Sequence, residues 1–321
     1  MKTDRRGFIK AAVAGGALVS AAKLPSFAED DPSVFPKRGK FERLALSYAT
    51  VRAGATKPFS VLHISDTHLS EAYPDEGETK LKLMDIRRRT FGGRQEEALR
   101  DSLSWAKANV EYVLHTGDLI DWQSRANLDL VKKCFGDRMF GSLGNHEFSI
   151  DMWLGDPKEK DEQWKAGSRE RLAAAFRFDI SLHSKVVNGV NFVTIDDVFG
   201  TVTPDQVERF RAEAKKGLPI VLCMPVPFYT DDIWRALTKF WKCAGKRFED
   251  AAIPPPDGEY MLQREDKTTR DFIAYLRKEP LLKAILAGHL HLTIEDRFSP
   301  TAVEYVVGGN FLFCGREVLF V

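Results

Sequence analysis

The sequence predicts an α/β protein in which two β-sheets pack face to face and helices cover their outer sides. Two observations support this fold class. Strand-like apolar runs alternate with helix-like segments, which is typical of parallel sheets, and several neighbouring runs are separated only by a short turn, which is typical of antiparallel pairs. About 290 residues follow the N-terminal leader described below and can bury one large core, so we expect a single domain.

The first half of the chain supplies four predicted strands and two helices. Residues 41–52 alternate apolar and polar side chains and turn at 54–58 into the run 59–65, which predicts an antiparallel pair. Residues 94–109 place apolar side chains on one stripe, as a helix does. The strand 113–116, the helix 126–135 and the strand 139–143 follow.

The second half begins with a hairpin, because Asn188-Gly189 separates two apolar runs by two turn residues. Thr203-Pro204-Asp205-Gln206 reads as a capped helix start, with Gly217 at the helix end. The remaining predicted strands are 220–224, 281–287, 294–298, 303–307 and 317–321. We interpret the segments 70–93, 148–165 and 229–267 as loop insertions that wall a cleft and set substrate choice.

Four short clusters of potential metal ligands each follow an apolar run. They are Asp66-Thr67-His68, Gly117-Asp118-Leu119-Ile120-Asp121, Gly144-Asn145-His146-Glu147 and Gly288-His289-Leu290-His291. Side chains at positions i and i+2 of an extended segment share a face, so the paired ligands of the first and last clusters can reach one site. Carboxylate, imidazole and amide ligands suit Mn, Fe or Zn rather than Cu(I).

Such ligands fit the hydrolysis of phosphate esters. Two divalent ions about 3.5–4 Å apart neutralise the phosphate oxygens and acidify a bridging water. Two neighbouring cations need a shared anion, and Asp118, after the run 112–116, is our candidate for the bridge.

In order and identity, the four clusters resemble the motifs of calcineurin-like metallophosphoesterases, which hydrolyse phosphate esters with two metals. The resemblance spans residues 59–321 and implies a four-layer αββα sandwich of two mixed sheets flanked by helices. The ligands that it implies are Asp66, His68, Asp118 and His291 for a first metal, and Asp118, Asn145 and His289 for a second. It also implies that His146 is the acid facing the leaving group and that Asp121 orients the His146 imidazole.

One ligand of the family is absent. The family's strand end reads M-H-x-P, whereas this chain has Met224-Pro225-Val226-Pro227. Proline carries no donor atom on its side chain, so we expect one tight metal site and a second, weaker site. Cys223 precedes Pro225 by two residues, and we interpret it as a buried thiol rather than a substitute ligand. We expect His63 and His115, which lie inside strands, to face away from the site.

These features leave two function classes open. The first is a metal-dependent hydrolase of phosphomonoesters or phosphodiesters, which the retention of His146 and Asp121 favours. The second is a non-catalytic descendant that binds a metal and a phosphorylated ligand or partner, which Pro225 favours. Glu147 is compatible with anchoring the site or with a plain surface or helix-capping role. Asn310 is compatible with shaping a turn.

The N-terminus resembles a twin-arginine export signal. Asp4-Arg5-Arg6-Gly7-Phe8-Ile9-Lys10 precedes a short apolar run, and Ser26-Phe27-Ala28 offers a cleavage point. The run is too short to span a membrane and holds no cysteine for a lipid anchor. We therefore expect a signal at 1–28, an extension and edge strand at 29–58, and a metallophosphoesterase domain at 59–321, exported by the twin-arginine machinery to the periplasm or beyond.

The net charge limits which binding partners we expect, and the cysteine spacing limits the cysteine chemistry. Removing residues 1–28 takes away five cations and one anion, which lowers the net charge from +1 to −3 and gives no support for nucleic-acid binding. We interpret Arg87-Arg88-Arg89 as a solvated loop face, and a small phosphate ester as the substrate. The four cysteines show no C-x-x-C spacing, so both a disulfide and buried free thiols remain open.

Overall fold

The computed structural model describes residues 43–150, 162–198, 200–243 and 266–321. The predicted signal at 1–28 lies outside these residues, as does the predicted extension up to residue 42. Within the described residues, no helix is both long and apolar enough to cross a membrane.

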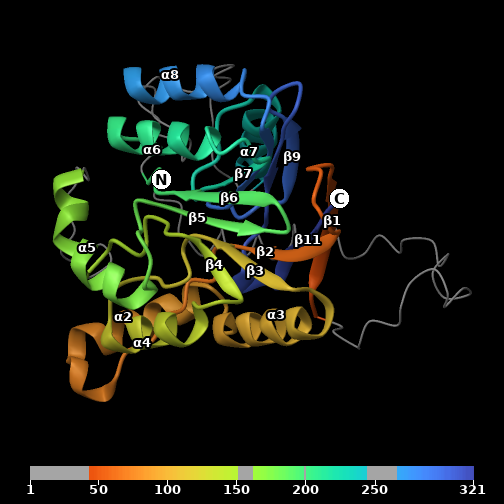
Figure 1. The fold of residues 1–321 in the computed structure, drawn as a ribbon. Helices are drawn as coiled ribbons and strands as arrows, with labels where there is room; N and C mark the ends of the chain where they lie inside the picture. Colours follow the sequence, from red (N-terminus) through yellow and green to blue (C-terminus); the bar gives the residue numbers. More distant parts are fainter. Residues whose placement is uncertain (1–42, 151–161, 199, 244–265) are drawn as a thin grey trace, which may run out of the picture.

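Two mixed β-sheets form the centre of the molecule (Figure 1). The first sheet has the order β1-β11-β2-β3-β4, with β1 at Ala45–Val51, β11 at Cys314–Phe320, β2 at Phe59–Ile64, β3 at Tyr112–Thr116 and β4 at Met139–Ser142. The second has the order β5-β6-β7-β8-β10-β9, with β5 at Leu182–Val187, β6 at Val190–Ile195, β7 at Ile220–Cys223, β8 at Leu282–Ala287, β10 at Val303–Val306 and β9 at Ile294–Arg297.

Helices cover the outer side of each sheet (Figure 1). The first sheet packs against α3 (Gln95–Asn109), α4 (Arg125–Cys134) and α5 (Glu162–Phe176), and the second against α6 (Pro204–Ala214), α7 (Asp231–Cys243) and α8 (Lys267–Leu276). Helix α2 (Glu78–Thr90) and the 3-10 turn η1 (Pro74–Glu76) lie between β2 and α3 in the chain. The predicted α/β sandwich of two mixed sheets between helices is confirmed.

The strand sequences explain the layers, because successive side chains point to opposite faces. In β2, Phe59 and Val61 enter the core between the sheets, whereas Leu62 and Ile64 pack under the helices. Strand β7 behaves in the same way, with Val221 and Cys223 facing the other sheet. Both strands are therefore buried on both faces.

The predicted antiparallel pairing of 41–52 with 59–65 is wrong. The C-terminal strand β11 lies between the two segments, parallel to β1 and antiparallel to β2. Chain proximity suggested the hairpin, but residues 314–320 provide a seven-residue partner whose Val318 and Phe320 fill the inter-sheet core.

The three predicted loop insertions contain helices. Segment 70–93 folds into η1 and α2, segment 148–165 runs into α5, and segment 229–267 contains α7. Their polar composition concealed the helical spacing of a few buried side chains, such as Leu83 in α2 and Trp234 in α7. The parts at 151–161 and 244–265 lie outside the described residues.

Two local predictions are confirmed in detail. Asn188 and Gly189 both have positive φ, at 45° and 81°, as a two-residue hairpin turn of type I′ requires. Thr203 caps α6: its hydroxyl accepts from the Gln206 N–H, and the Gln206 side chain accepts from the Thr203 N–H. Helix α6 ends at Ala214, three residues before Gly217.

Candidate metal centre

The predicted ligands lie on loops that follow β2, β3, β4 and β8. Backbone bonds join the first two loops directly, because the Asp66 N–H donates to the Gly117 carbonyl at 2.9 Å and the His68 N–H to the Asp118 carbonyl at 2.8 Å. The carboxyl ends of the neighbouring parallel strands β2 and β3 thus present their ligands together, where α/β proteins commonly bind ligands.

The backbone at the site is unusual. Eight non-glycine residues in the described chain have positive φ, and five are predicted ligands: Asp66, His68, Asp118, His289 and His291, with φ between 54° and 67°. This left-handed conformation is unfavourable for residues with a Cβ atom and is enriched at functional sites. The concentration of strain on these residues marks the loops as a candidate site independently of residue type.

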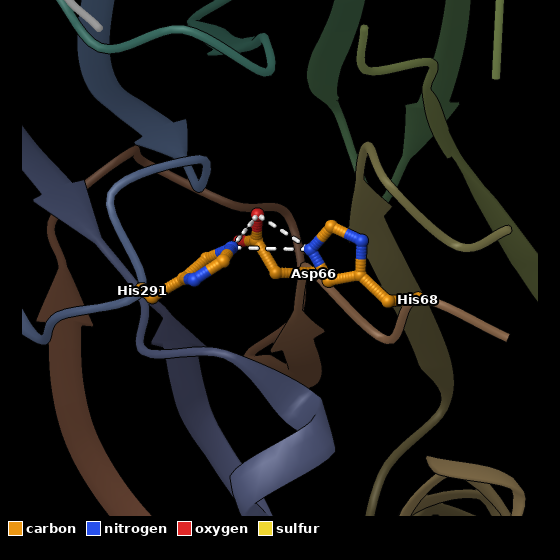
Figure 2. Close-up of side chains that lie close together, drawn as sticks. All are labelled: Asp66, His68 and His291. Carbon is orange, nitrogen blue, oxygen red and sulfur yellow. Dashed lines mark hydrogen bonds and ion pairs between the residues drawn. The ribbon is translucent and has the colours of Figure 1, made fainter. Parts of the chain in front are cut away.

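Asp66 connects the two sheets. Its carboxylate accepts the His289 N–H, at 3.1 Å from Oδ1 and 2.9 Å from Oδ2, and its Oδ1 lies 3.3 Å from His291 Nε2. Figure 2 shows the Asp66 carboxylate between the imidazoles of His68 and His291, which point toward it from opposite sides. A residue after β2 of the first sheet therefore holds the loop after β8 of the second.

The side chains predicted for the first metal converge. His68 Nε2 lies 3.1 Å from His291 Nε2, 4.0 Å from Asp66 Oδ1 and 3.9 Å from Asp118 Oδ2. Asp66, His68 and His291 each offer one ligand atom within 4.8 Å of the others, and so do His68, Asp118 and His146. Of the predicted histidine ligands, only His289 belongs to neither of these groups among the described residues.

Asn145 and Asp118 are the predicted ligands on the loops after β4 and β3. Asn145 Oδ1 is buried and has no hydrogen-bond partner among the described residues, so this oxygen is available to coordinate a cation. Asp118 Oδ1 accepts the His146 N–H at 3.0 Å. A Cβ atom on Gly144 would lie 2.2 Å from that oxygen, so only glycine allows this approach. The donor set and the unpaired amide oxygen fit a divalent metal.

Asp121 contacts two of the site's imidazoles at once. Its Oδ1 lies 3.1 Å from His68 Nδ1 and 2.8 Å from His146 Nδ1. The same carboxylate receives Nε and Nη2 of Arg87, the latter at 2.8 Å from Oδ1. Arg87 is only 2% exposed, so the interpretation of residues 87–89 as a solvated face is wrong at this position. Arg88 pairs with Glu71, and Arg89 is exposed.

Charges within the site shift the pKa values of its carboxyl groups. Burial raises the pKa of Asp66, but the imidazoles of His291, His68 and His289 outweigh burial and lower it. Burial, with the carboxylates of Glu147 and Asp66, raises the pKa of Asp118 well above its usual range. A cation would relieve this repulsion, because metal binding favours the ionised ligand.

Two of the predicted histidine ligands, His68 and His289, are held in the neutral form that ligates metals. Burial lowers the pKa of His68 to about 3, with the neighbouring His146 acting in the same direction, and burial lowers the pKa of His289 to about 4. Both imidazoles are therefore neutral near pH 7, as metal coordination requires.

Buried polar side chains support the loops from beneath. Glu147 is fully buried and accepts the N–H groups of Asp118, Ile120 and Gly144, so it anchors two ligand loops and has no surface role. Asn310 accepts the Thr67 hydroxyl at 3.1 Å, beyond shaping the turn that it begins. The sequence left both roles open.

His63 and His115 are buried and lie outside both ligand groups. His63 Nε2 lies 2.9 Å from the Thr116 hydroxyl, and His115 Nε2 lies 2.9 Å from that of Thr67. Sequence reasoning missed Phe91, whose ring stacks on the His68 imidazole with centroids 4.2 Å apart. Recognising 78–90 as a helix would have placed Arg87 four residues from Leu83 on its buried face.

Pro225 lies beside the Asp118 loop. A Cβ atom on Gly117 would meet the Pro225 Cβ at 2.9 Å, and the Pro225 carbonyl accepts the Gly288 N–H at 3.1 Å. Proline thus occupies the position between the second and fourth ligand loops. Cys223 is buried in the inter-sheet core, and burial raises the pKa of its thiol, in agreement with its interpretation as a structural thiol. Cys134 and Cys314 are also free thiols.

Fold and site together define a two-sheet α/β protein with a candidate metal centre at its strand ends. The sequence pattern of the calcineurin-like phosphoesterases matches residues 59–293, and the chain belongs to this family.

Several solved structures are similar to this chain. A dimetal phosphatase from Danio rerio is 15% identical with a TM-score of 0.45, and the match covers 79% of this chain and 88% of that one. Phosphopantetheinyl hydrolase from Mycobacterium tuberculosis is 13% identical with a TM-score of 0.40, covering 79% and 91%. A 5'-nucleotidase from Candida albicans is 11% identical with a TM-score of 0.39, covering 84% and 47%. No curated protein matches the chain.

Proposed function

We propose that this protein is a metal-dependent hydrolase of phosphate esters with one tight metal site and one weakened site. The observation that carries the proposal is the convergence of Asp66, His68 and His291 ligand atoms within 4.8 Å at the strand ends. Membership of the calcineurin-like phosphoesterase family supports the same chemistry.

We assign the first metal to Asp66, His68, Asp118 and His291, and the second to Asp118, Asn145 and His289. When bound, divalent ions supply positive charge for the phosphate oxygens and acidify water. Because Pro225 offers no donor atom, the second site depends on fewer protein ligands and should bind more weakly. Mn, Fe and Zn suit the mixture of carboxylate, imidazole and amide donors.

The remaining site residues handle the leaving group. We assign His146 as the acid: its Nδ1 contacts Asp121, and when both ring nitrogens carry a proton, Nε2–H faces the substrate and gives its proton to the departing oxygen, leaving the neutral ring with Nδ1–H. Asp121 fixes the tautomer of that ring, since its carboxylate can only accept from Nδ1–H.

Metal content and turnover test the proposal together. The purified protein, loaded with Mn²⁺, should hydrolyse an aryl phosphate monoester or diester, and a chelator should abolish that activity. His146→Ala provides the matched control, because it should keep metal while losing turnover.

Pro225 favours a second candidate function, a non-catalytic protein that keeps the metal and binds a phosphorylated ligand. A protein that binds Mn²⁺ and a non-hydrolysable phosphonate but turns over neither ester class would support this candidate and refute the first.

We also propose that the precursor is exported by the twin-arginine machinery, because Arg5-Arg6 precedes a short apolar run. Replacing both arginines by lysine should leave the protein in the cytoplasmic fraction of a twin-arginine-competent host. Unchanged export of that variant would reject the assignment.

A further inference from the structure

Helix α2 brings Arg87 to the candidate metal centre from outside the four ligand clusters. Leu83 and Arg87 are its two buried residues, and they lie on one face at positions i and i+4. Leu83 packs on Trp122, the residue after Asp121, while Arg87 reaches Asp121 itself. The helix therefore docks on the Asp121–Trp122 segment through apolar contacts of Leu83 and Met84 and a charged contact of Arg87.

The contact between Arg87 and Asp121 has the geometry of a fork. Arg87 Nε donates to Asp121 Oδ2 and Nη2 donates to Oδ1 at 2.8 Å, so both carboxylate oxygens are held by one planar group. The Arg87 guanidinium also lies over the Phe91 ring, 4.8 Å from its centroid, and Phe91 stacks on His68. Arg87 thus has fixed neighbours on more than one side.

The oxygen fixed by this fork is the one that contacts both imidazoles. Asp121 Oδ1 lies 3.1 Å from His68 Nδ1 and 2.8 Å from His146 Nδ1. Rotation of the carboxylate would break both of these contacts: His146 Nδ1 would keep only its contact with the Asp121 backbone carbonyl at 3.4 Å, and His68 Nδ1 would lose this oxygen. A bidentate cation can hold it, since a fork sets the plane of the carboxylate as well as its position.

We propose that Arg87 is a positioning residue: it fixes the Asp121 carboxylate so that Oδ1 keeps the rings of His68 and His146 in the Nδ1–H tautomer. Nε2 of His68 is then left unprotonated and directed to the ligand group, whereas His146, once Nε2 is also protonated, directs its Nε2–H to the leaving group. The consequence for His146 rests on the proposed function, whereas the consequence for His68 concerns metal binding alone. Segment 70–93 accordingly acts on the ligands themselves, beyond any role in walling a cleft.

The experiment compares Arg87→Gln and Arg87→Lys with Arg89→Gln, a control on the exposed face of the same helix. Imidazole ¹⁵N spectra of the metal-free protein report the tautomers, with His183 as a remote reference. Arg87→Gln should mix the tautomers of His68 and His146 and leave His183 unchanged. Mn²⁺ affinity by calorimetry should fall about 10–100-fold, the usual effect of removing a group that orients a metal ligand.

Steady-state kinetics provide a second measurement, separate from the spectra and the Mn²⁺ affinity. Arg87→Gln should lower kcat with little change in KM. The loss in kcat should be larger for an alkyl phosphate than for an activated aryl phosphate, because only the poor alkoxide leaving group needs the acid. In an Asp121→Asn background the same substitution should add little, as expected for residues acting in series. Arg87→Lys keeps the charge but loses the fork, so an intermediate effect is expected.

The outcomes separate the two proposals. If the wild-type protein hydrolyses no phosphoester, the proposed function fails, while the spectra and the Mn²⁺ affinity still decide the role of Arg87. A folded Arg87→Gln protein with wild-type spectra and affinity would overturn the positioning role. If Arg87→Gln does not fold, the Arg87→Lys protein decides. Wild-type ¹⁵N spectra and Mn²⁺ affinity in Arg87→Lys would overturn the positioning role, and altered spectra and affinity would support it.

Discussion

At the scale of single residues, Asp118 and His146 differ in what they contact within the candidate site. Asp118 contacts both halves of the site: its Oδ2 lies 3.9 Å from His68 Nε2, and its Oδ1 accepts the His146 N–H. His146 contacts Asp121 through its ring. Substitutions at the two positions should therefore have different consequences.

Asp118→Asn should lose both metals and all activity, because it removes the negative charge shared between two cations. His146→Ala should retain its metals but lower turnover by about 10²–10⁴, the usual scale for general acid catalysis. Metal analysis of the purified variants, alongside kcat for an aryl phosphate, checks both. Loss of metal from His146→Ala would show that His146 is a ligand, as its grouping with His68 and Asp118 also allows.

Pro225→His should raise the affinity of the second metal site. The Pro225 ring lies against the Gly117 position beside Asp118, so an imidazole there can approach the side of the site that Asn145 faces. Calorimetric titration with Mn²⁺ should show two unequal steps for the wild-type protein and a tighter second step for the variant. Two tight sites without turnover of any phosphoester would favour the non-catalytic function.

The sequence revealed the candidate ligands because they form short local motifs, each at the end of an apolar run. It could not reveal Arg87, whose partner Asp121 is 34 residues away and whose burial depends on how α2 docks. Glu147 belonged to a recognised cluster, but its three N–H donors come from two loops that meet only in the folded chain. Roles set by contacts between distant segments leave no local signature.

At the scale of elements, the same limit explains which parts of the fold were predicted. The hairpin at Asn188-Gly189 and the capping box at Thr203 depend on neighbouring residues, and both were predicted correctly. The insertion of β11 between β1 and β2 depends on pairing residues 45–51 with residues 314–320. No local pattern encodes that choice, since either neighbour would bury the apolar face of β2.

Two glycine substitutions test the assigned backbone conformations of helix α5 and of the turn between β5 and β6. Gly167 lies exposed in the interior of α5, and a Cβ atom there would have no neighbour within 4 Å, so Gly167→Ala should stabilise the protein by about 0.5–1 kcal/mol. Gly189 has a φ of 81°, and a Cβ atom there would lie 3.0 Å from Thr56 Cγ2. Gly189→Ala should destabilise by about 1–2 kcal/mol.

Urea unfolding of the two variants and the wild type measures these differences. Shifts of the midpoint in opposite directions at constant slope would agree with the prediction in sign. A stabilised Gly189→Ala would contradict the assigned turn, and a destabilised Gly167→Ala would contradict the exposed helical position.

At the scale of the whole molecule, buried acids link stability to pH. Burial, with the nearby Asp197 carboxylate acting in the same direction, raises the pKa of Glu304 to about 8 against an opposing bond from the Phe228 N–H. Burial also raises the pKa of Asp197 well above its usual range. Each carboxyl has one buried oxygen without a partner among the described residues, so its ionised form is poorly solvated.

The folded protein therefore retains a proton on Glu304 that the unfolded chain releases near its ordinary pKa of 4.5. Stability should fall as the pH rises from about 4.5 to about 8, by on the order of a few kcal/mol for this group. Glu304→Gln keeps an acceptor for the Phe228 N–H and cannot ionise, so its stability should vary less over this range. Parallel pH profiles of urea-unfolding free energy for the two proteins would contradict the assignment.

The position of Asp66 between the sheets has a consequence for the order in which the protein is assembled. His68 and His291 are 223 residues apart in the chain, and their rings meet only when the loops after β2 and β8 come together. Under the proposed assignment, the first metal is therefore captured late in folding, because its ligands do not exist as a set before the sheets dock. A bound ion would then join segments 223 residues apart as a cross-link does, so metal binding should slow the separation of the two sheets and protease attack on the core.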